Sequence, residues 1–259
     1  MGDDNHLLIE HPADRVLLLR LNRPHRRNAL TGALVKDLAI QLSSAAASDK
    51  VSAVVIAGDA KAFCAGADIH EMVARGIEAI LDEERLASWR SIGTFHKPLI
   101  AAVRGVALGA GNELAMMADL IVAGESARFG QPEVRIGGLA GDGGTQRLPR
   151  LVGRQLATRM MLTGEPISAQ CAKDIGLICE VVPDANVDGA AVDLAASIAR
   201  HAPLSLAATK ALIAATDRCG LDEGLRIERE ALLRIFQSED RVEGMTAFAE
   251  KRPPRWRNR

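Results

Sequence analysis

The sequence predicts an α/β fold in which ββα units stack into a superhelix, followed by a region that is entirely helical. Short apolar runs with strand character alternate with runs that carry apolar residues at helical spacing. The order longer strand, short strand, helix recurs, which favours a stacked superhelix over a doubly wound sheet. Since the chain has 259 residues, we expect one large core, residues 1–195, and a smaller helical region, residues 196–259.

The expected elements follow in chain order. Two strand-like runs, 6–10 and 16–21, precede a helix that begins after the N-cap candidate Thr31 and reaches residue 47. Leucines four residues apart give that helix one apolar face. The repeated unit comes next, as strands and helices at 51–58, 61–66 and 82–95, then 99–103, 106–108 and 112–117, with a further strand at 120–123.

The last part of the chain is predicted to form four helices. The second of them carries an apolar stripe at helical spacing. Such a terminal block either forms an oligomer interface or covers the core of its own chain, and the spacing alone fits both. The expected helices span 191–200, 203–217, 221–237 and 239–251.

Charge and composition exclude several classes of function. The net charge is −1, whereas a nucleic-acid partner requires a basic surplus, so we expect none. The most apolar stretch, 98–124, is interrupted by Arg104, Glu113 and Asp119, so we expect no membrane span. The acidic N-terminus does not resemble a signal peptide. Four cysteines without a CxxC pair or metal-ligand spacing favour reduced thiols, a cytoplasmic location and no metal site.

Residues 62–69 are the first segment that can carry chemistry. Small residues connect a strand to an expected helix there, in the order Ala-Phe-Cys-Ala-Gly-Ala-Asp-Ile. Small side chains let a ligand approach the backbone, and the N–H groups at a helix start point outward as donors. The alternative is a tight turn that simply needs small residues.

A second such segment covers residues 107–117. Here a strand runs through Gly109 and Gly111 into a helix, but Leu114 stands where a dinucleotide fingerprint needs its third glycine. Glu113 is followed by an unbroken apolar run, which favours a carboxylate that faces the core or a cleft. The alternative is an exposed glutamate stabilised by the helix dipole.

Glu133 supplies a second carboxylate. Pro132 fixes the backbone directly before it, and a glycine-rich stretch that contains Asp142 follows. One of two neighbouring carboxylates can act as a general base while the other, with a raised pKa, acts as an acid. Taken alone, Glu133 also fits an ordinary exposed turn.

Together these segments resemble the crotonase superfamily, the enoyl-CoA hydratase/isomerase enzymes, and most of all its hydratases. The matching strings are KAFCAGADI, ALGAGNELAMM, FGQPE and GGTQRL, in the order that the family has them. The resemblance runs from the Asn22-Arg23-Pro24 turn to Phe248 and Lys251. It implies a superhelix of ββα turns with a C-terminal helical trimerisation region, in a homotrimer or a dimer of trimers.

The resemblance also implies a mechanism, the reversible syn hydration of 2-trans-enoyl-CoA to 3-hydroxyacyl-CoA in acyl-CoA degradation. The N–H groups of Ala67 and Ala110 would bind the thioester oxygen as an oxyanion hole. Glu113 would deprotonate the attacking water, and Glu133 would deliver a proton to C2. No separate cofactor is implied, since coenzyme A is part of the substrate.

The substrate pocket implied by the resemblance includes both catalytic alanines and residues from distant parts of the chain. Its nucleotide end would lie near Arg27, and Phe248 and Lys251 would complete it, in some family members from a neighbouring subunit. Beyond Arg252 the basic end of the chain also fits a solvated tail. The substrate-binding residues expected are Arg27, Lys61, Ala65, Ala67, Asp68, Ile69, Ala110, Gly141, Phe248 and Lys251.

Two positions depart from the family pattern. Ala110 stands where glycine is frequent, and its Cβ is tolerated only if φ is negative. Asp142 adds a third carboxylate beside the catalytic pair, either to cap the following helix or to raise the pKa of a glutamate. The competing functions are an enoyl-CoA isomerase, a hydratase for a branched, cyclic or aromatic acyl group, and a non-catalytic relative that binds acyl-CoA or RNA.

Overall fold

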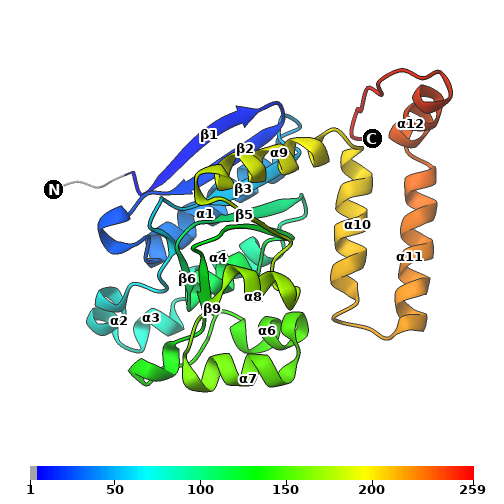
Figure 1. The fold of residues 1–259 in the computed structure, drawn as a ribbon. Coiled ribbons are helices and arrows are strands. Elements are labelled where there is room, and N and C mark those ends of the chain that lie inside the picture. Colours follow the sequence, from blue (N-terminus) through cyan, green and yellow to red (C-terminus); the bar gives the residue numbers. More distant parts are fainter. Residues whose placement is uncertain (1–4) are drawn as a thin grey trace.

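The computed structural model describes residues 5–259 as two sheets, the helices that cover them and a projecting arm of helices (Figure 1). The start of the chain, residues 1–4, on which our expectation about a signal peptide depends, lies outside the described residues. Within the described part no helix is long and apolar enough to cross a membrane.

The strands form one six-stranded and one four-stranded sheet. The large sheet has the order β1-β2-β3-β5-β7-β10 and is parallel except for the antiparallel pair β1 and β2. The small sheet has the order β4-β6-β8-β9, with only β8 and β9 antiparallel. The bounds are β1 Leu7–Ala13, β2 Val16–Leu21, β3 Ala53–Ala57, β4 Ala62–Cys64, β5 Leu99–Val103, β6 Val106–Leu108, β7 Leu120–Gly124, β8 Arg128–Gly130, β9 Ile167–Ser168 and β10 Glu180–Val182.

The predicted superhelix of ββα units is confirmed by this topology. The consecutive strands β3, β5 and β7 lie side by side in the large sheet, and each is followed by a short strand, β4, β6 or β8, in the small sheet. Each turn of the superhelix therefore adds one strand to both sheets. The corner after β5 requires glycine, because Gly105 has a φ of +60° and a Cβ there would lie 1.9 Å from the carbonyl oxygen of Lys61.

Helices cover both faces of the large sheet. Along β2, Leu17 and Leu19 belong to the hydrophobic cluster shared with α1, while Val16 and Leu18 belong to the cluster shared with α9. This alternation follows from the period of two along a strand. The bounds are α1 Gly32–Ala47, α2 Ile69–Arg75, α3 Glu78–Leu81, α4 Glu83–Gly93, α5 Ala110–Ala115, α6 Gly144–Val152, α7 Arg154–Thr163, α8 Ala169–Asp174 and α9 Val187–Ala199, with short 3-10 helices η1 Pro24–Arg26, η2 Glu133–Ile136 and η3 Asp184–Asn186.

Several local predictions can be compared directly with these bounds. Thr31 caps α1, since its side chain accepts a hydrogen bond from the N–H of Leu34. The helix expected from residue 112 begins two residues earlier, at Ala110. Helices α7 and α8 and strands β9 and β10 were not predicted. The expected division after residue 195 falls inside α9, which packs on the large sheet along its length.

The last three helices form an arm that projects from the two sheets (Figure 1). They are α10 Pro203–Ala215, α11 Leu221–Phe236 and α12 Glu239–Ala249. No residue of α10 is buried, and the arm exposes large apolar side chains such as Ile213, Leu221 and Phe248. Lys210 ties α10 to the core, because its ammonium donates to the carbonyl of Lys97 and pairs with Asp119 at 2.8 Å.

The basic end of the chain folds back onto the arm. The backbone N–H groups of Arg257 and Asn258 donate to the carboxylate of Asp240, and the indole N–H of Trp256 donates to the carbonyl of Arg200. The side chains of Arg257 and Arg259 pair with Glu239 and remain about two-thirds exposed, at 65% and 64%. The backbone of this segment is therefore fixed, while the charges at its end face solvent.

Candidate active site

Two neighbouring strand ends bring Ala67 and Ala110 together. Strands β4 and β6 are parallel, and Cys64 pairs with Ala107. Ala67 and Ala110 each lie three residues beyond this pair, so both follow the carboxyl ends of adjacent strands. This shared register places the two predicted oxyanion-hole residues on adjacent loops.

A glycine with positive φ precedes each of these alanines. Gly66 has a φ of +121° and Gly109 a φ of +53°, conformations that L side chains rarely adopt. The two loops touch, because a Cβ built on Gly109 would lie 3.8 Å from the Cα of Gly66. Ala110 itself is not among the described residues with positive φ. Its Cβ is therefore accommodated where the family often has glycine.

The backbone hydrogen bonds described around Ala67 and Ala110 do not use the N–H groups of these two residues. The bridge between Leu30 and residues 66–68 uses the carbonyl of Gly66 and the N–H of Asp68, not the N–H of Ala67. Ala110 is the first residue of α5, so its N–H has no carbonyl partner within the helix. Both N–H groups are thus suited to donate to a ligand.

Glu113 lies on α5 and is 1% exposed. Its Oε1 accepts hydrogen bonds from the backbone N–H of Gly144 at 2.6 Å and of Asp142 at 2.9 Å. Burial raises the pKa of Glu113 to about 7, and the charges of Asp142 and Glu133 add to the rise. The prediction of a buried carboxylate is confirmed, and its pKa suits a general base near neutral pH.

Glu133 begins η2 and lies beside the same loop. A Cβ built on Gly109 would be 3.1 Å from its Oε1, and its Oε2 is buried without a partner among the described residues. Burial, with a further contribution from Asp142, raises the pKa of Glu133. An unpaired buried carboxyl oxygen is costly, which is typical of a group that awaits a substrate or water.

The turn between η2 and α6 holds Glu113, and Asp142 lies in it. The N-cap of α6 is Gly143, without a side-chain cap, so the expectation that Asp142 caps this helix is wrong. Its carboxylate pairs instead with Arg85 of α4 at 2.5 Å. The alternative expectation, an effect on the catalytic carboxyls, fits the contribution of Asp142 to the raised pKa values of Glu113 and Glu133.

The structure brings most of the nucleotide-end candidates to one side of this site. The N–H of Ala65 donates to the carbonyl of Arg27 at 3.0 Å. The buried side chain of Asn28 donates to the carbonyl of Ala62, which joins the Arg27 loop to the start of β4, where Lys61 lies. Arg27 and Lys61 are both exposed. These two cations therefore lie at the solvent edge of the segment that leads to Ala67.

Three further predicted residues occupy different environments. Asp68 is 6% exposed, its carboxylate accepts from the N–H groups of His70 and Glu71 at the start of α2, and it pairs with Arg23 at 3.0 Å. Its side chain is thus engaged in capping and an ion pair. The other two are exposed, Ile69 on the first turn of α2 and Gly141 directly before Asp142.

Phe248 and Lys251 are not brought to the site within one chain. Phe248 is 86% exposed near the end of α12, and Lys251 follows that helix. Helix α12 lies at the upper right of Figure 1, beyond the start of α10 and away from the two sheets. Their predicted role in the pocket requires a contribution from a second subunit.

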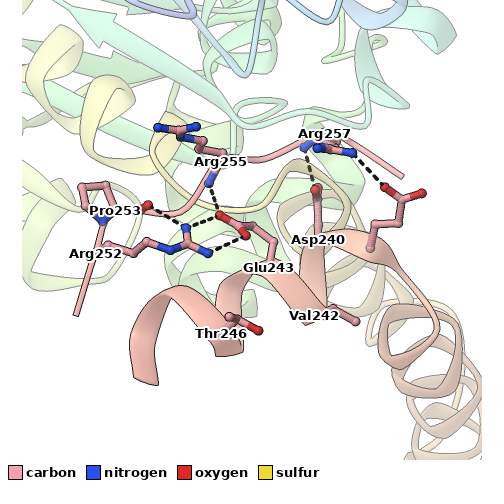
Figure 2. A pocket seen from close by; sticks show the side chains of 9 residues that line it. Asp240, Val242, Glu243, Thr246, Arg252, Pro253, Arg255 and Arg257 are labelled. Atoms are coloured by element: carbon pink, nitrogen blue, oxygen red, sulfur yellow. Dashed lines mark hydrogen bonds and ion pairs between the residues drawn. The ribbon is translucent and has the colours of Figure 1, made fainter. Parts of the chain in front are cut away.

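A cavity lies between α12 and the C-terminal segment (Figure 2), and neither Glu113 nor Glu133 lines it. It has a volume of about 860 Å³. Its carboxylates already have partners, since Glu243 pairs with Arg252 at 2.6 Å and accepts from the N–H of Arg255. These contacts hold the end of the chain against α12 and belong to the arm rather than to the candidate active site.

Sequence reasoning missed two arginines that organise the site. Arg85 reaches the turn from α4, and Arg147 of α6 donates to the carbonyl of Asp142 at 3.1 Å. Arg147 lies within the quoted string GGTQRL, so that string was a signal for it. Arg85 is 57 residues away from Asp142, and no local pattern marks it.

Comparisons with known proteins show the family to which the chain belongs. The profile of the enoyl-CoA hydratase/isomerase family matches residues 12–259. The 2,3-dehydroadipyl-CoA hydratase of Escherichia coli (strain K12) is 46% identical over 97% of this chain and 99% of its own. A mitochondrial enoyl-CoA hydratase of Pongo abelii is 43% identical over 91% of this chain and 81% of its own.

A solved structure shows the same similarity in three dimensions. The enoyl-CoA hydratase from Bacillus anthracis superposes with a TM-score of 0.94 and 34% identity, over 98% of this chain and 100% of that one. The fold is the crotonase fold that the sequence predicted. The chain therefore belongs to the enoyl-CoA hydratase/isomerase family.

Proposed function

We propose that this protein hydrates 2-trans-enoyl-CoA thioesters to 3-hydroxyacyl-CoA, reversibly and by syn addition of water, in acyl-CoA degradation. One observation carries the proposal. Two carboxyl groups with raised pKa values, those of the buried Glu113 and the half-buried Glu133, lie beside the loop that also presents the N–H of Ala110. The names of the relatives, which are hydratases of enoyl-CoA or dehydroadipyl-CoA, support the same reaction.

In this proposal the thioester oxygen binds between the N–H groups of Ala67 and Ala110. These donors stabilise the negative charge that develops on the oxygen when C3 is attacked. Loss of one such donor costs about 3–4 kcal/mol in comparable sites. The positive φ of the glycine before each alanine gives the backbone the turn that presents these donors.

Glu113 acts as the general base. Its Oε1 is occupied by two backbone N–H groups, which leaves Oε2 to bind the water. The carboxylate removes one proton from that water as the oxygen bonds to C3. A pKa near 7 keeps enough of the group ionised at neutral pH and still makes it an effective proton acceptor.

Glu133 acts as the general acid and transfers its proton to C2. Its buried, unpaired Oε2 is suited to hold a proton before the transfer. After one turnover Glu113 is protonated and Glu133 is ionised, and exchange with solvent restores both groups. Neither step requires a metal or a redox cofactor, and coenzyme A enters only as part of the substrate.

Product analysis in deuterated water tests the proposal against isomerisation. Incubation of an enoyl-CoA should give a 3-hydroxyacyl-CoA with one deuterium at C2, and the double bond should be lost. A shifted double bond without added water would show an isomerase, and binding without turnover would show a non-catalytic relative. A Glu133→Gln variant that retains full hydration would contradict the role of Glu133 as acid.

We further propose that the chain assembles as a homotrimer or a dimer of trimers. The exposed apolar side chains of α10–α12 form a surface that a monomer would leave in water. In such an assembly Phe248 and Lys251 of one subunit would complete the coenzyme A pocket of the next. Sedimentation equilibrium tests this proposal, since a monomer at micromolar concentration would contradict it.

A cytoplasmic location completes the proposal. All four cysteines, Cys64, Cys171, Cys179 and Cys219, are free thiols. Unpaired cysteines are typical of a reducing compartment. Cell fractionation with an antibody against the protein tests this location.

A further inference from the structure

The turn that holds Glu113 is itself fixed by a buried ion pair. Arg85 of α4 contacts the carboxylate of Asp142 at 2.5 Å, and the two side chains are only 11% and 9% exposed. The backbone N–H of the same Asp142 donates to Oε1 of Glu113. One residue thus joins the cation of a distant helix to the carboxylate of the general base.

A second arginine, Arg147 of α6, also contacts this turn. Arg147 donates to the carbonyl of Asp142 at 3.1 Å. Its guanidinium lies directly on the peptide of Gly143, because a Cβ built there would be 1.8 Å from Nη1 of Arg147. The same turn is therefore contacted by Arg147 at Asp142 and Gly143 and by Arg85 at the carboxylate of Asp142.

Arg85 lies on a helix, α4, that is capped and packed against the core. The side chain of Asp82 caps α4 and accepts from the N–H of Arg85 at 3.0 Å. Trp89 and Ile92 on the same helix are at most 5% exposed. The guanidinium of Arg85 lies 5.9 Å from the ring centroid of Trp89. Arg85 is thus held on packed structure rather than on a mobile loop.

We propose that Arg85 and Asp142 form a positioning pair that sets the place and the electrostatic environment of Glu113 in the hydration reaction. The inference rests on the proposed function and extends it to two residues that do not touch the substrate. Asp142 orients the N–H that binds Glu113, and its charge faces the catalytic carboxyls. Arg85 fixes that charge in place and partly offsets it.

The electrostatic part of the proposal gives opposite effects for the two partners. The charged groups that face Glu113 are Asp142 in the turn, Glu133 of η2, Arg147 of α6 and, through Asp142, Arg85 of α4. Loss of the negative charge of Asp142 favours the ionised form of Glu113 and lowers its pKa. Loss of the positive charge of Arg85 favours the protonated form and raises its pKa.

The kinetic experiment compares Asp142→Asn and Arg85→Met with the wild type over a range of pH. Both variants should lower kcat by about tenfold or more while KM changes little, since a misplacement of about 1 Å can cost about a hundredfold. The acid limb of kcat/KM should lie at lower pH in Asp142→Asn than in Arg85→Met, by more than about half a pH unit. A purely structural role would not separate the two limbs.

Two further variants serve as controls. Arg85→Lys keeps the charge, and it should regain part of kcat and return the acid limb toward that of the wild type. Glu84 lies on the same helix as Arg85 and forms an exposed ion pair with Lys36 of α1. Glu84→Gln removes this pair and should change neither kcat nor the pH of the acid limb. Values of kcat within about twofold of the wild type in both test variants, or a separation below about half a pH unit, would overturn the proposal.

A titration without substrate separates this inference from the proposed reaction. Infrared difference spectroscopy of the carboxylate band, with Glu113→Gln as the reference, measures the pKa of Glu113 in each variant. A lower value in Asp142→Asn than in Arg85→Lys would support the electrostatic link even if the protein hydrates no enoyl-CoA that is tested. Equal values in the two variants would overturn that link, whatever the activity. If the methionine variant does not fold, the lysine and asparagine variants carry the test.

Discussion

The carboxylate of Glu133 lies directly against Gly109. A Cβ built on Gly109 would be 3.1 Å from Oε1 of Glu133 and 3.5 Å from its Cδ. Gly109 also precedes Ala110, whose N–H we assign to the oxyanion hole. The proposed acid and one proposed donor therefore meet at a residue that has no side chain.

Gly109→Ala should abolish most of the hydratase activity. The new methyl group would press on the carboxylate of Glu133, and the φ of +53° would be strained by about 1–3 kcal/mol. Gly76→Ala is the matched control, because Gly76 has nearly the same backbone angles (φ 57°, ψ −136° against φ 53°, ψ −128°) and nothing within 4 Å of its Cβ position. Equal losses of activity in the two variants would contradict a specific role for this contact.

Glu113→Gln should make the protein more stable above pH 7 while it removes activity. The carboxyl ionises near its ordinary value of 4.5 in the unfolded chain and near 7 in the folded one. Between these two pKa values the folded state binds more protons than the unfolded state. The free energy of unfolding therefore falls as pH rises from 4.5 to 7 and no longer changes from this cause above pH 7. The shift corresponds to at most about 3 kcal/mol, which urea unfolding of both proteins at pH 5 and pH 8 measures. A variant with the pH dependence of the wild type would show that Glu113 does not titrate in this way.

The pH profile of the wild type should show an acid limb near 7. The general base must be ionised, and burial raises the pKa of Glu113 to about 7, so kcat/KM should rise as pH increases through this value. Initial rates with saturating and limiting enoyl-CoA between pH 5 and pH 9 measure it. An acid limb near the ordinary value for glutamate, about 4.3, would contradict the assigned environment.

Lys97→Met should destabilise the fold without a direct effect on the active site. Lys97 is 8% exposed and donates to the carbonyls of Ala45, Ser48 and Val51 at the end of α1. Loss of these bonds should lower the free energy of unfolding by about 3 kcal/mol. Lys36→Met, which removes an exposed ion pair, should change the free energy of unfolding much less in the same urea titration. A smaller loss for Lys97→Met than for Lys36→Met would refute this reasoning.

The repeated units could be predicted because their signals are local. The apolar runs of β3, β5 and β7 are buried at nearly every position, and each is followed within a few residues by a short strand and a turn. Glu113 could be singled out because a carboxylate next to five apolar residues is costly unless it has partners or a function. The start of α5 was placed two residues late, because glycines mark a turn and a helix start equally well.

Other features depend on contacts that no local pattern encodes. Helix α6 contains Pro149 and has Gly143 as an N-cap without a side-chain hydrogen bond, so no local pattern marks where it begins. The pairing of Arg85 with Asp142 joins two elements far apart in the sequence, so the sequence left two roles open for Asp142, a helix cap and an effect on the catalytic carboxyls. The place of Phe248 and Lys251 depends on how the arm projects and on what a second subunit covers.

The most direct measurement is the loss of absorbance of the enoyl-thioester band of crotonyl-CoA, with the wild type beside Glu113→Gln. We expect a rapid loss with the wild type and none above background with the variant, while both proteins bind the substrate and unfold cooperatively. Equal rates in the two proteins would contradict the role of Glu113 as the base and, with it, the mechanism proposed for this site.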